Sequence, residues 1–168
     1  MRRTIVLLAT MALTLLVASG VAVAAAIQCS GGTSCFGTSK ADTLTGTDLP
    51  EKIYGLGGPD LIKGLGVADR LSGGSGGDDV LGGNGQEFIE GAGGDDDLRG
   101  GGDDDIILAG NGDDTVFGNG GNDIIHVDGD EQYGFQDEVF CTQTLDSADT
   151  LFVDQNDVLH DCGIFPDP

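Results

Sequence analysis

Residues 73–81 read Gly-Gly-Ser-Gly-Gly-Asp-Asp-Val-Leu, and residues 82–90 read Gly-Gly-Asn-Gly-Gln-Glu-Phe-Ile-Glu. Each nonapeptide begins with glycines and has an acidic residue at position six and an aliphatic residue at position eight. Outward from this stretch the acidic residue recurs every nine positions without an insertion, as Asp42, Glu51, Asp60, Asp69, Asp78, Glu87, Asp96, Asp105, Asp114 and Asp123. The aliphatic residues are Leu44, Ile53, Ile62, Leu71, Val80, Ile89, Leu98, Ile107, Val116 and Ile125. A glycine stands five residues before each acid except Asp114, where Ala109 replaces it.

The residue types of this unit predict one turn followed by one short strand. Glycines allow the positive φ angles of a tight turn, and the aliphatic residue between two variable ones is typical of a three-residue strand with its centre facing inward. Two units complete a coil of eighteen residues, and stacked coils form two parallel sheets around an aliphatic core. The repeat therefore predicts an all-β, parallel β-roll solenoid of ten nonapeptides.

The composition favours cations as partners. The chain has 168 residues, 31 of them glycine, with 29 acidic against 7 basic residues and a formal charge of −22. Nucleic acid and anionic membrane surfaces would be repelled by this charge. So much Gly and Asp would by itself indicate disorder, and only the fixed register argues against that interpretation.

The pattern Gly-Gly-x-Gly-x-Asp-x-aliphatic-x resembles the repeats-in-toxin (RTX), or haemolysin-type, calcium-binding nonapeptide. Residues 73–81 match it fully, and residues 82–90 match it with Glu in place of Asp. The resemblance covers residues 37–131 and implies a β-roll with calcium ions between the turns of successive coils. The first two repeats depart from it, since residues 46–51 lack the later glycines, and there we expect weak calcium binding or none. Residues 100–105 also depart, with Asp103 where the fourth glycine belongs.

Stacking of alternate repeats places acidic residues eighteen apart along each edge. Two carboxylates at the inter-strand spacing repel by roughly 1–3 kcal/mol, so the roll should not close without counter-ions. Two carboxylates and turn carbonyls form an all-oxygen site that suits Ca2+, whereas Mg2+ demands tighter geometry and soft metals lack their ligands. We therefore expect several calcium ions, with folding coupled to their binding. The expected ligand residues are Asp60, Asp69, Asp78, Glu87, Asp96, Asp105, Asp114, Asp123, Gly73, Gly74, Gly76, Gly82, Gly83, Gly85, Gly91, Gly93, Gly100 and Gly102.

The N-terminal residues read as a secretory signal peptide over 1–26. Arg2 and Arg3 precede an apolar run, and small residues follow with an A-x-A site at 24–26. A single-span membrane anchor is the alternative, although the apolar run is short for a span. The remaining organisation is predicted as an N-terminal cap segment over 27–36, the roll over 37–131 and a C-terminal cap over 132–168. The protein is expected to be secreted.

The four cysteines, Cys29, Cys35, Cys141 and Cys162, favour two disulfides in an exported chain. Three pairings are possible, and proximity favours Cys29 with Cys35 and Cys141 with Cys162. A metal site is the alternative, but the chain has no C-x-x-C pair.

The outward positions beside the core residues include an apolar set, Phe88, Ile106, Leu108 and Ile124. Such a patch indicates a contact surface. The C-terminal segment is one occupant, and a protein or cell-surface partner or a second copy is the alternative. No catalytic set accompanies the repeats, because His126 and His160 are isolated, so we expect no enzyme. The sequence favours a secreted calcium-binding structural or interaction module. A carbohydrate- or ice-binding solenoid or an adhesin-like surface protein is the alternative, but the outward positions lack the repeated Thr or aromatic ladder of a solenoid of that kind.

Overall fold

The computed structural model describes residues 25–32, 34–127, 135–141, 149–153 and 155–160. In these residues the protein is all-β, and no helix is present that could cross a membrane. The strands are β1 (Ala25–Gln28), β2 (Ser34–Phe36), β3 (Asp42–Thr45), β4 (Lys52–Gly57), β5 (Leu61–Leu65), β6 (Arg70–Ser75), β7 (Asp79–Asn84), β8 (Phe88–Gly93), β9 (Asp97–Gly102), β10 (Ile106–Asn111), β11 (Thr115–Asn119), β12 (Ile124–His126), β13 (Glu138–Phe140), β14 (Thr150–Phe152) and β15 (Val158–His160).

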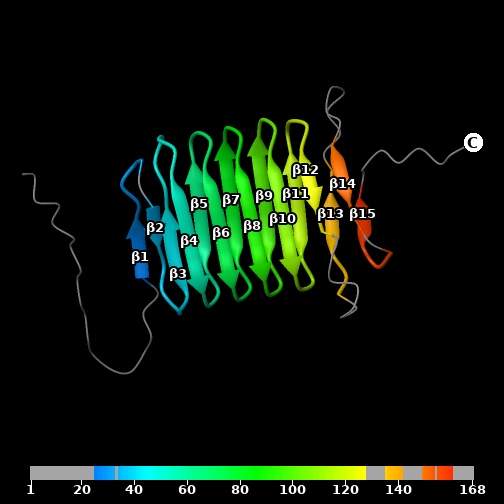
Figure 1. Ribbon diagram of the computed structural model, residues 1–168, viewed down its shortest axis with the longest axis horizontal. Helices are drawn as coiled ribbons and strands as arrows, with labels where there is room; N and C mark the ends of the chain where they lie inside the picture. The colour runs from blue at the N-terminus through cyan, green and yellow to red at the C-terminus, as the bar shows by residue number, and fades with distance from the viewer. Residues whose placement is uncertain (1–24, 33, 128–134, 142–148, 154, 161–168) are drawn as a thin grey trace, which may run out of the picture.

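The strands alternate between two sheets as the chain coils, which produces a parallel β-solenoid of about seven turns (Figure 1). One sheet has eight strands in the order β1-β3-β5-β7-β9-β11-β13-β15. The other has seven strands in the order β14-β12-β10-β8-β6-β4-β2. Every pairing between neighbours is parallel, as in β5 with β7 and β6 with β8. The predicted all-β roll with two parallel sheets is confirmed.

The strand register follows the eighteen-residue coil. Ile62 pairs with Val80, and Val80 pairs with Leu98, so equivalent aliphatic residues stack on one another inside the solenoid. All ten predicted core residues, Leu44, Ile53, Ile62, Leu71, Val80, Ile89, Leu98, Ile107, Val116 and Ile125, are 0 % exposed. Most strands of the repeats are longer than the predicted three residues, with six each in β6 to β10, whereas β12 has three. The ladder continues into the turn, as the pairing of Leu56 with Gly74 shows.

The first coil lies upstream of the first nonapeptide. Strands β1 and β2 extend the two sheets by pairing Ile27 with Leu44 and Cys35 with Ile53. Cys29 and Cys35 form a disulfide, which is the pairing expected for these two residues. The described part of the segment 27–36 is therefore continuous with the roll.

The described strands of the C-terminal segment also extend the two sheets. Val139 pairs with Val116 in one sheet, and Leu151 pairs with Ile125 in the other. These residues have left the nine-residue spacing but keep the inward position of the repeat. Cys141 is disulfide-bonded, whereas Cys162 lies outside the described residues, as does most of the predicted signal peptide.

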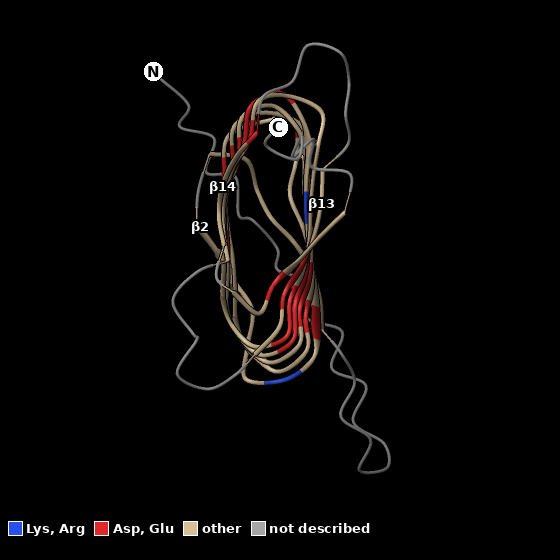
Figure 2. Ribbon diagram, turned by 90° about the vertical axis from the view of Figure 1, so that its right-hand side faces the viewer, with Lys and Arg blue, Asp and Glu red and all other residues tan. Residues whose placement is uncertain are grey.

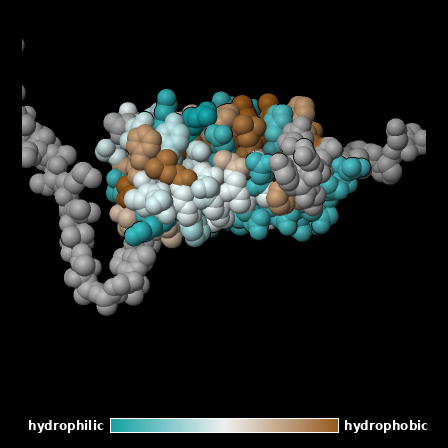
Figure 3. Space-filling view, turned by 60° about the horizontal axis from the view of Figure 1, so that its bottom comes forward, coloured by the Kyte–Doolittle hydropathy of each residue, from teal (hydrophilic) through white to brown (hydrophobic). Residues whose placement is uncertain are grey.

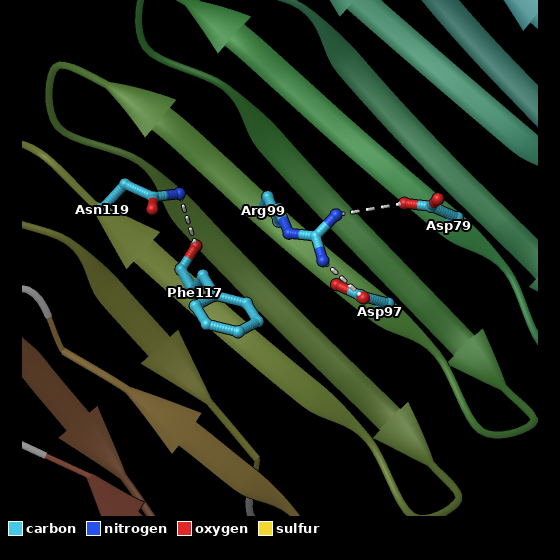
Figure 4. Close-up of polar contacts among 5 residues, drawn as sticks. All are labelled: Asp79, Asp97, Arg99, Phe117 and Asn119. Atoms are coloured by element: carbon cyan, nitrogen blue, oxygen red, sulfur yellow. Dashed lines mark hydrogen bonds and ion pairs between the residues drawn. The ribbon is translucent and has the colours of Figure 1, made fainter.

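On the face of the molecule that Figure 3 shows, hydrophobic residues gather in patches beside hydrophilic ones. Arg99 lies 2.7 Å from Asp97 and 3.6 Å from Asp79, two acids that face each other across β7 and β9 (Figure 4). The arginine relieves the repulsion between these acids. On the other sheet Ile106 and Ile124 pair in register and are 39 % and 38 % exposed.

We predict that the buried aliphatic residues such as Ile107 stabilise the roll, whereas the outward-facing residues such as Ile106 do not. Ile107→Ala removes a side chain that is 0 % exposed and should destabilise the calcium-loaded protein by about 2–5 kcal/mol in urea unfolding. Ile106→Ala, the neighbouring exposed isoleucine, is the matched control and should change stability by roughly 0.5 kcal/mol or less. Equal effects of the two substitutions would contradict the placement of the core.

Candidate metal-binding turns

The acidic residues of the repeats collect along two opposite edges of the flattened solenoid (Figure 2). One edge carries Asp60, Asp78, Asp96 and Asp114, and the other carries Asp69, Glu87, Asp105 and Asp123, each just before a strand. All eight side chains are buried, with at most 4 % of their surface exposed. Buried carboxylates need partners, because an ion removed from water loses its hydration.

One oxygen of each of the seven aspartates in these rows accepts a hydrogen bond from the preceding coil, and Glu87 is the exception. The backbone N–H of Asp78 donates to Oδ1 of Asp96 at 2.8 Å, and the N–H of Asp96 donates to Oδ1 of Asp114 at 2.8 Å. The opposite edge repeats the arrangement, with the N–H of Asp105 donating to Oδ1 of Asp123 at 2.9 Å. These bonds run through consecutive coils and fix the position of each of the seven aspartates in its turn.

Further carboxylate oxygens in these turns are buried without a hydrogen-bond donor. Within the described residues this applies to Oδ2 of Asp60, Asp69, Asp78, Asp96, Asp105 and Asp123, and to both carboxylate oxygens of Glu87. Leaving a buried acceptor unsatisfied costs about 1–3 kcal/mol, and more for a charged group. A bound cation would remove this cost at all of these sites, so the orphaned oxygens fit a metal ion.

Backbone carbonyls lie beside these oxygens. A Cβ atom added to Gly55 would collide with both Oδ2 of Asp60 and the carbonyl oxygen of Gly73 on the next coil. Gly91 stands in the same relation to Asp96 and to the carbonyl of Ala109. The described residues contain no group of three or more His, Cys, Asp or Glu side chains that could hold a metal ion. The carboxylate oxygens and turn carbonyls that meet beside Gly55 and Gly91 form an all-oxygen set of the kind that Ca2+ prefers.

Burial raises the pKa of the stacked acids. Desolvation is the main cause at Asp78, where the pKa rises to about 6, and at Asp96, where it rises to about 7. At Asp105, desolvation and then the negative charges of Glu87 and Asp123 raise the pKa to about 8, against a lowering by the hydrogen bond with the backbone of Glu87. The pKa of Glu87 rises to about 7, again mainly because the side chain is buried. The ionised form of these carboxyl groups is therefore electrostatically unfavourable in the absence of a cation.

The predicted glycines occupy three kinds of position. Gly74, Gly76, Gly83 and Gly85 have positive φ, and Gly73, Gly82, Gly91 and Gly100 are the crowded first residues of their turns. Gly93 and Gly102 are different, because a Cβ would meet nothing closer than 4.0 Å at Gly93 and nothing within 4 Å at Gly102. Gly94, which the sequence analysis did not include, has a φ of 121° and lies against the carbonyl of Gly76.

Sequence reasoning missed three acids that continue the row. The N–H groups of Asp114, Asp123 and Asp137 donate to Oδ1 of Asp137, Asp149 and Asp157 at 2.8, 3.1 and 3.3 Å. Each new acid stands two residues before an aliphatic residue, as in Asp137-Glu138-Val139. That local pattern was the available signal, but the strict nine-residue spacing had ended.

The fold and the turns define a parallel β-solenoid with rows of buried carboxylates and turn carbonyls on both edges. The family model of the RTX calcium-binding nonapeptide repeat matches residues 54–86 and 90–125, as four copies. The chain therefore carries the repeats of this family, and the resemblance seen in the sequence is confirmed. Repeats of this family bind Ca2+, and the solenoid is a β-roll of that type. No curated protein and no solved structure matched the chain.

The raised pKa values predict how acidity acts on the calcium-free chain. A pKa above its unfolded value means that the folded state binds protons more tightly, so stability falls as pH rises. In chelator, strand content measured by circular dichroism should be higher at pH 5 than at pH 8, with the change centred at the values of about 6 to 8 at Asp78, Asp96 and Asp105. Strand content that increases with pH in chelator would contradict the burial of these acids.

Two neighbouring glycines offer a matched test of the turn geometry. Gly94→Ala forces a β-carbon into a left-handed conformation and against the Gly76 carbonyl, at a cost of about 1–2 kcal/mol or more. Gly93→Ala meets no such obstacle. In thermal unfolding of the calcium-loaded protein, we expect the first variant to melt well below the second, and the reverse order would show that the turn is wrongly described.

Proposed function

We propose that this chain is a secreted protein module whose β-roll is assembled by calcium, and that it acts as a structural or interaction element rather than as an enzyme. The observation that carries the proposal is the row of buried carboxylate oxygens without hydrogen-bond donors at six successive turns from Asp60 to Asp105 and at Asp123. In the proposal the ions lie in the turns beside the carboxylates and the carbonyls of the adjoining coil. Calcium supplies the positive charge that these oxygens lack.

Calcium is favoured over other cations by the donor chemistry. Carboxylate and backbone carbonyl oxygens are hard ligands, and turns built from successive coils offer a flexible site of the kind that Ca2+ accepts. Magnesium demands near-ideal octahedral geometry and retains its waters. Thiolate and imidazole ligands of softer metals do not occur in these turns.

Folding and binding are one process in this proposal. The carboxylates come together only when coils stack, so the site does not exist in the unfolded chain. Without the cation, closing the roll would bury the acids against one another in an unfavourable environment. The aliphatic row contributes the hydrophobic term, but each coil presents only two of these core residues, such as Val80 and Ile89, to a thin interior.

Secretion is supported by two features of the chain. The first is the charged, apolar and small-residue order of residues 1–26, which is typical of a signal peptide. The second is the Cys29–Cys35 disulfide, since such bonds persist in oxidising compartments. The outer face around Ile106 and Ile124 is the surface that the proposal assigns to a protein or cell-surface partner.

The binding role is tested by two adjacent aspartates. Asp96 is 3 % exposed and faces the turn, whereas Asp97 is half-buried on the outer face beside Arg99. Asp96→Asn keeps the acceptor for the Asp78 amide but removes the charge, so equilibrium dialysis should show one or two fewer bound calcium ions than in the wild type. Asp97→Asn is the control and should bind the wild-type number.

Magnesium at the same concentration should not replace calcium in this measurement. Loss of ions in the Asp97→Asn variant but not in Asp96→Asn, or no calcium bound by the wild type, would contradict the proposed function.

A further inference from the structure

The first two turns, residues 37–42 and 46–51, satisfy their carboxylates in a different way from the later turns. The residue after the first glycine is a threonine in both. The backbone N–H and the hydroxyl of Thr38 donate to Oδ2 of Asp42 at 2.6 and 2.8 Å. The N–H of Thr47 donates to Oε2 of Glu51 at 3.1 Å, and its hydroxyl donates to Oε1. These two acids have the donors that the later turns lack.

The threonine hydroxyls also accept hydrogen bonds from the backbone of their own turns. The N–H of Lys40 donates to Oγ1 of Thr38, and the N–H of Leu49 donates to Oγ1 of Thr47, each at 3.2 Å. Each hydroxyl thus connects the turn backbone to the carboxylate. Asp42 and Glu51 are as buried as the later acids, at 3 % and 4 % exposed, yet neither has an orphaned buried oxygen.

The backbone of the turn differs at the same position. Non-glycine residues that follow the first glycine in later turns lie in the left-handed region, with φ of 79° at Leu56, 85° at Leu65 and 83° at Ala92. Thr38 and Thr47 do not adopt positive φ. Their N–H groups point at the carboxylate of the turn, so the chain contains two classes of turn with two ways of stabilising a buried acid.

We propose that Thr38 and Thr47 take the place of calcium in the first two turns, which therefore bind no ion and keep their shape without it. Two further contacts that need no calcium hold the same part of the chain, the Cys29–Cys35 disulfide and the stacking of Phe36 on Tyr54 at 5.2 Å. A coil formed in this way offers the edges of β2 and β3 for pairing with β4 and β5, on which calcium-loaded coils can add. The inference rests on the proposed function, that the later turns take calcium.

The inference is tested by counting ions in two double variants of the full, disulfide-bonded chain. D42N/E51Q removes the charge of the threonine turns but leaves acceptor oxygens for Thr38 and Thr47, and it should bind as many calcium ions as the wild type in equilibrium dialysis. D60N/D69N, at the next two turns, is the matched control and should bind fewer. Fewer ions in D42N/E51Q would overturn the inference while leaving the proposed function standing. A wild type that binds no calcium would overturn both.

Hydrogen exchange in chelator tests the second half of the inference. The amides of Thr38 and Thr47 should exchange at least about tenfold more slowly than those of Leu56 and Leu65, because in the proposal the threonine turns stay closed on their carboxylates in chelator while the later turns open. The T38S/T47S variant keeps the hydroxyls and should retain this protection, whereas the isosteric T38V/T47V variant should lose most of it. Equal exchange rates for all four amides in the wild type would overturn the inference.

Discussion

The structure depends on how each buried carboxylate is satisfied. A repeat of nine residues stacks an acid on the acid eighteen residues away, and from Asp60 onward a backbone amide of the preceding coil reaches one oxygen of each aspartate, as between Asp78 and Asp96. The second oxygen is buried beside a glycine and a carbonyl of the next coil, where the described turns offer Asp78 and Asp96 no donor. The same stacking that aligns the aliphatic core therefore generates an unfavourable row of anions. The proposed cation between coils would resolve both the charge and the missing hydrogen bonds.

This constraint explains why glycine and the aliphatic residue recur with the acid. The first glycine is needed because a side chain there would collide with the carboxylate, as at Gly55 and Asp60. The aliphatic residue two positions after the acid faces inward, since strand residues alternate, and Ile62 is 0 % exposed for this reason. Where the acid finds donors within its own turn, as Asp42 does from Thr38, the later glycines disappear as well.

Much of the fold could be predicted because the repeat has a fixed spacing. The nine-residue period alone located the core from Leu44 to Ile125 and the alternation of two sheets. It could not locate β1 and β2, because Ile27 and Cys35 have no acid two residues before them. The nine-residue period also failed to locate Asp137 and Asp149, because longer segments separate the strands there. The left-handed conformation of Leu56 and Leu65 contradicts residue preference and is imposed by stacking on neighbouring coils.

The sequence identified which acidic residues lie in the turns, but it could not show how their carboxylate oxygens are bonded. The pattern placed Asp96 and Asp105 in the turns, yet only the structure shows that one oxygen of each accepts from a backbone amide and the other has no donor. The structure also distinguishes Asp96 from its neighbour Asp97, because Asp97 faces outward and contacts Arg99. The ten-unit count, the C-terminal cap and the number of ions remain predictions, since the family model recognises four copies within residues 54–125.

The most direct test of this account is far-UV circular dichroism of the chain from Ile27 onward at pH 7.5, titrated with calcium from a chelator-treated start. The account predicts a largely disordered chain that gains strand structure cooperatively with calcium and not with equal magnesium. A spectrum already rich in strand in chelator, unchanged by calcium, would show that the core and disulfides hold the roll alone. It would contradict the claim that the buried carboxylates require a cation.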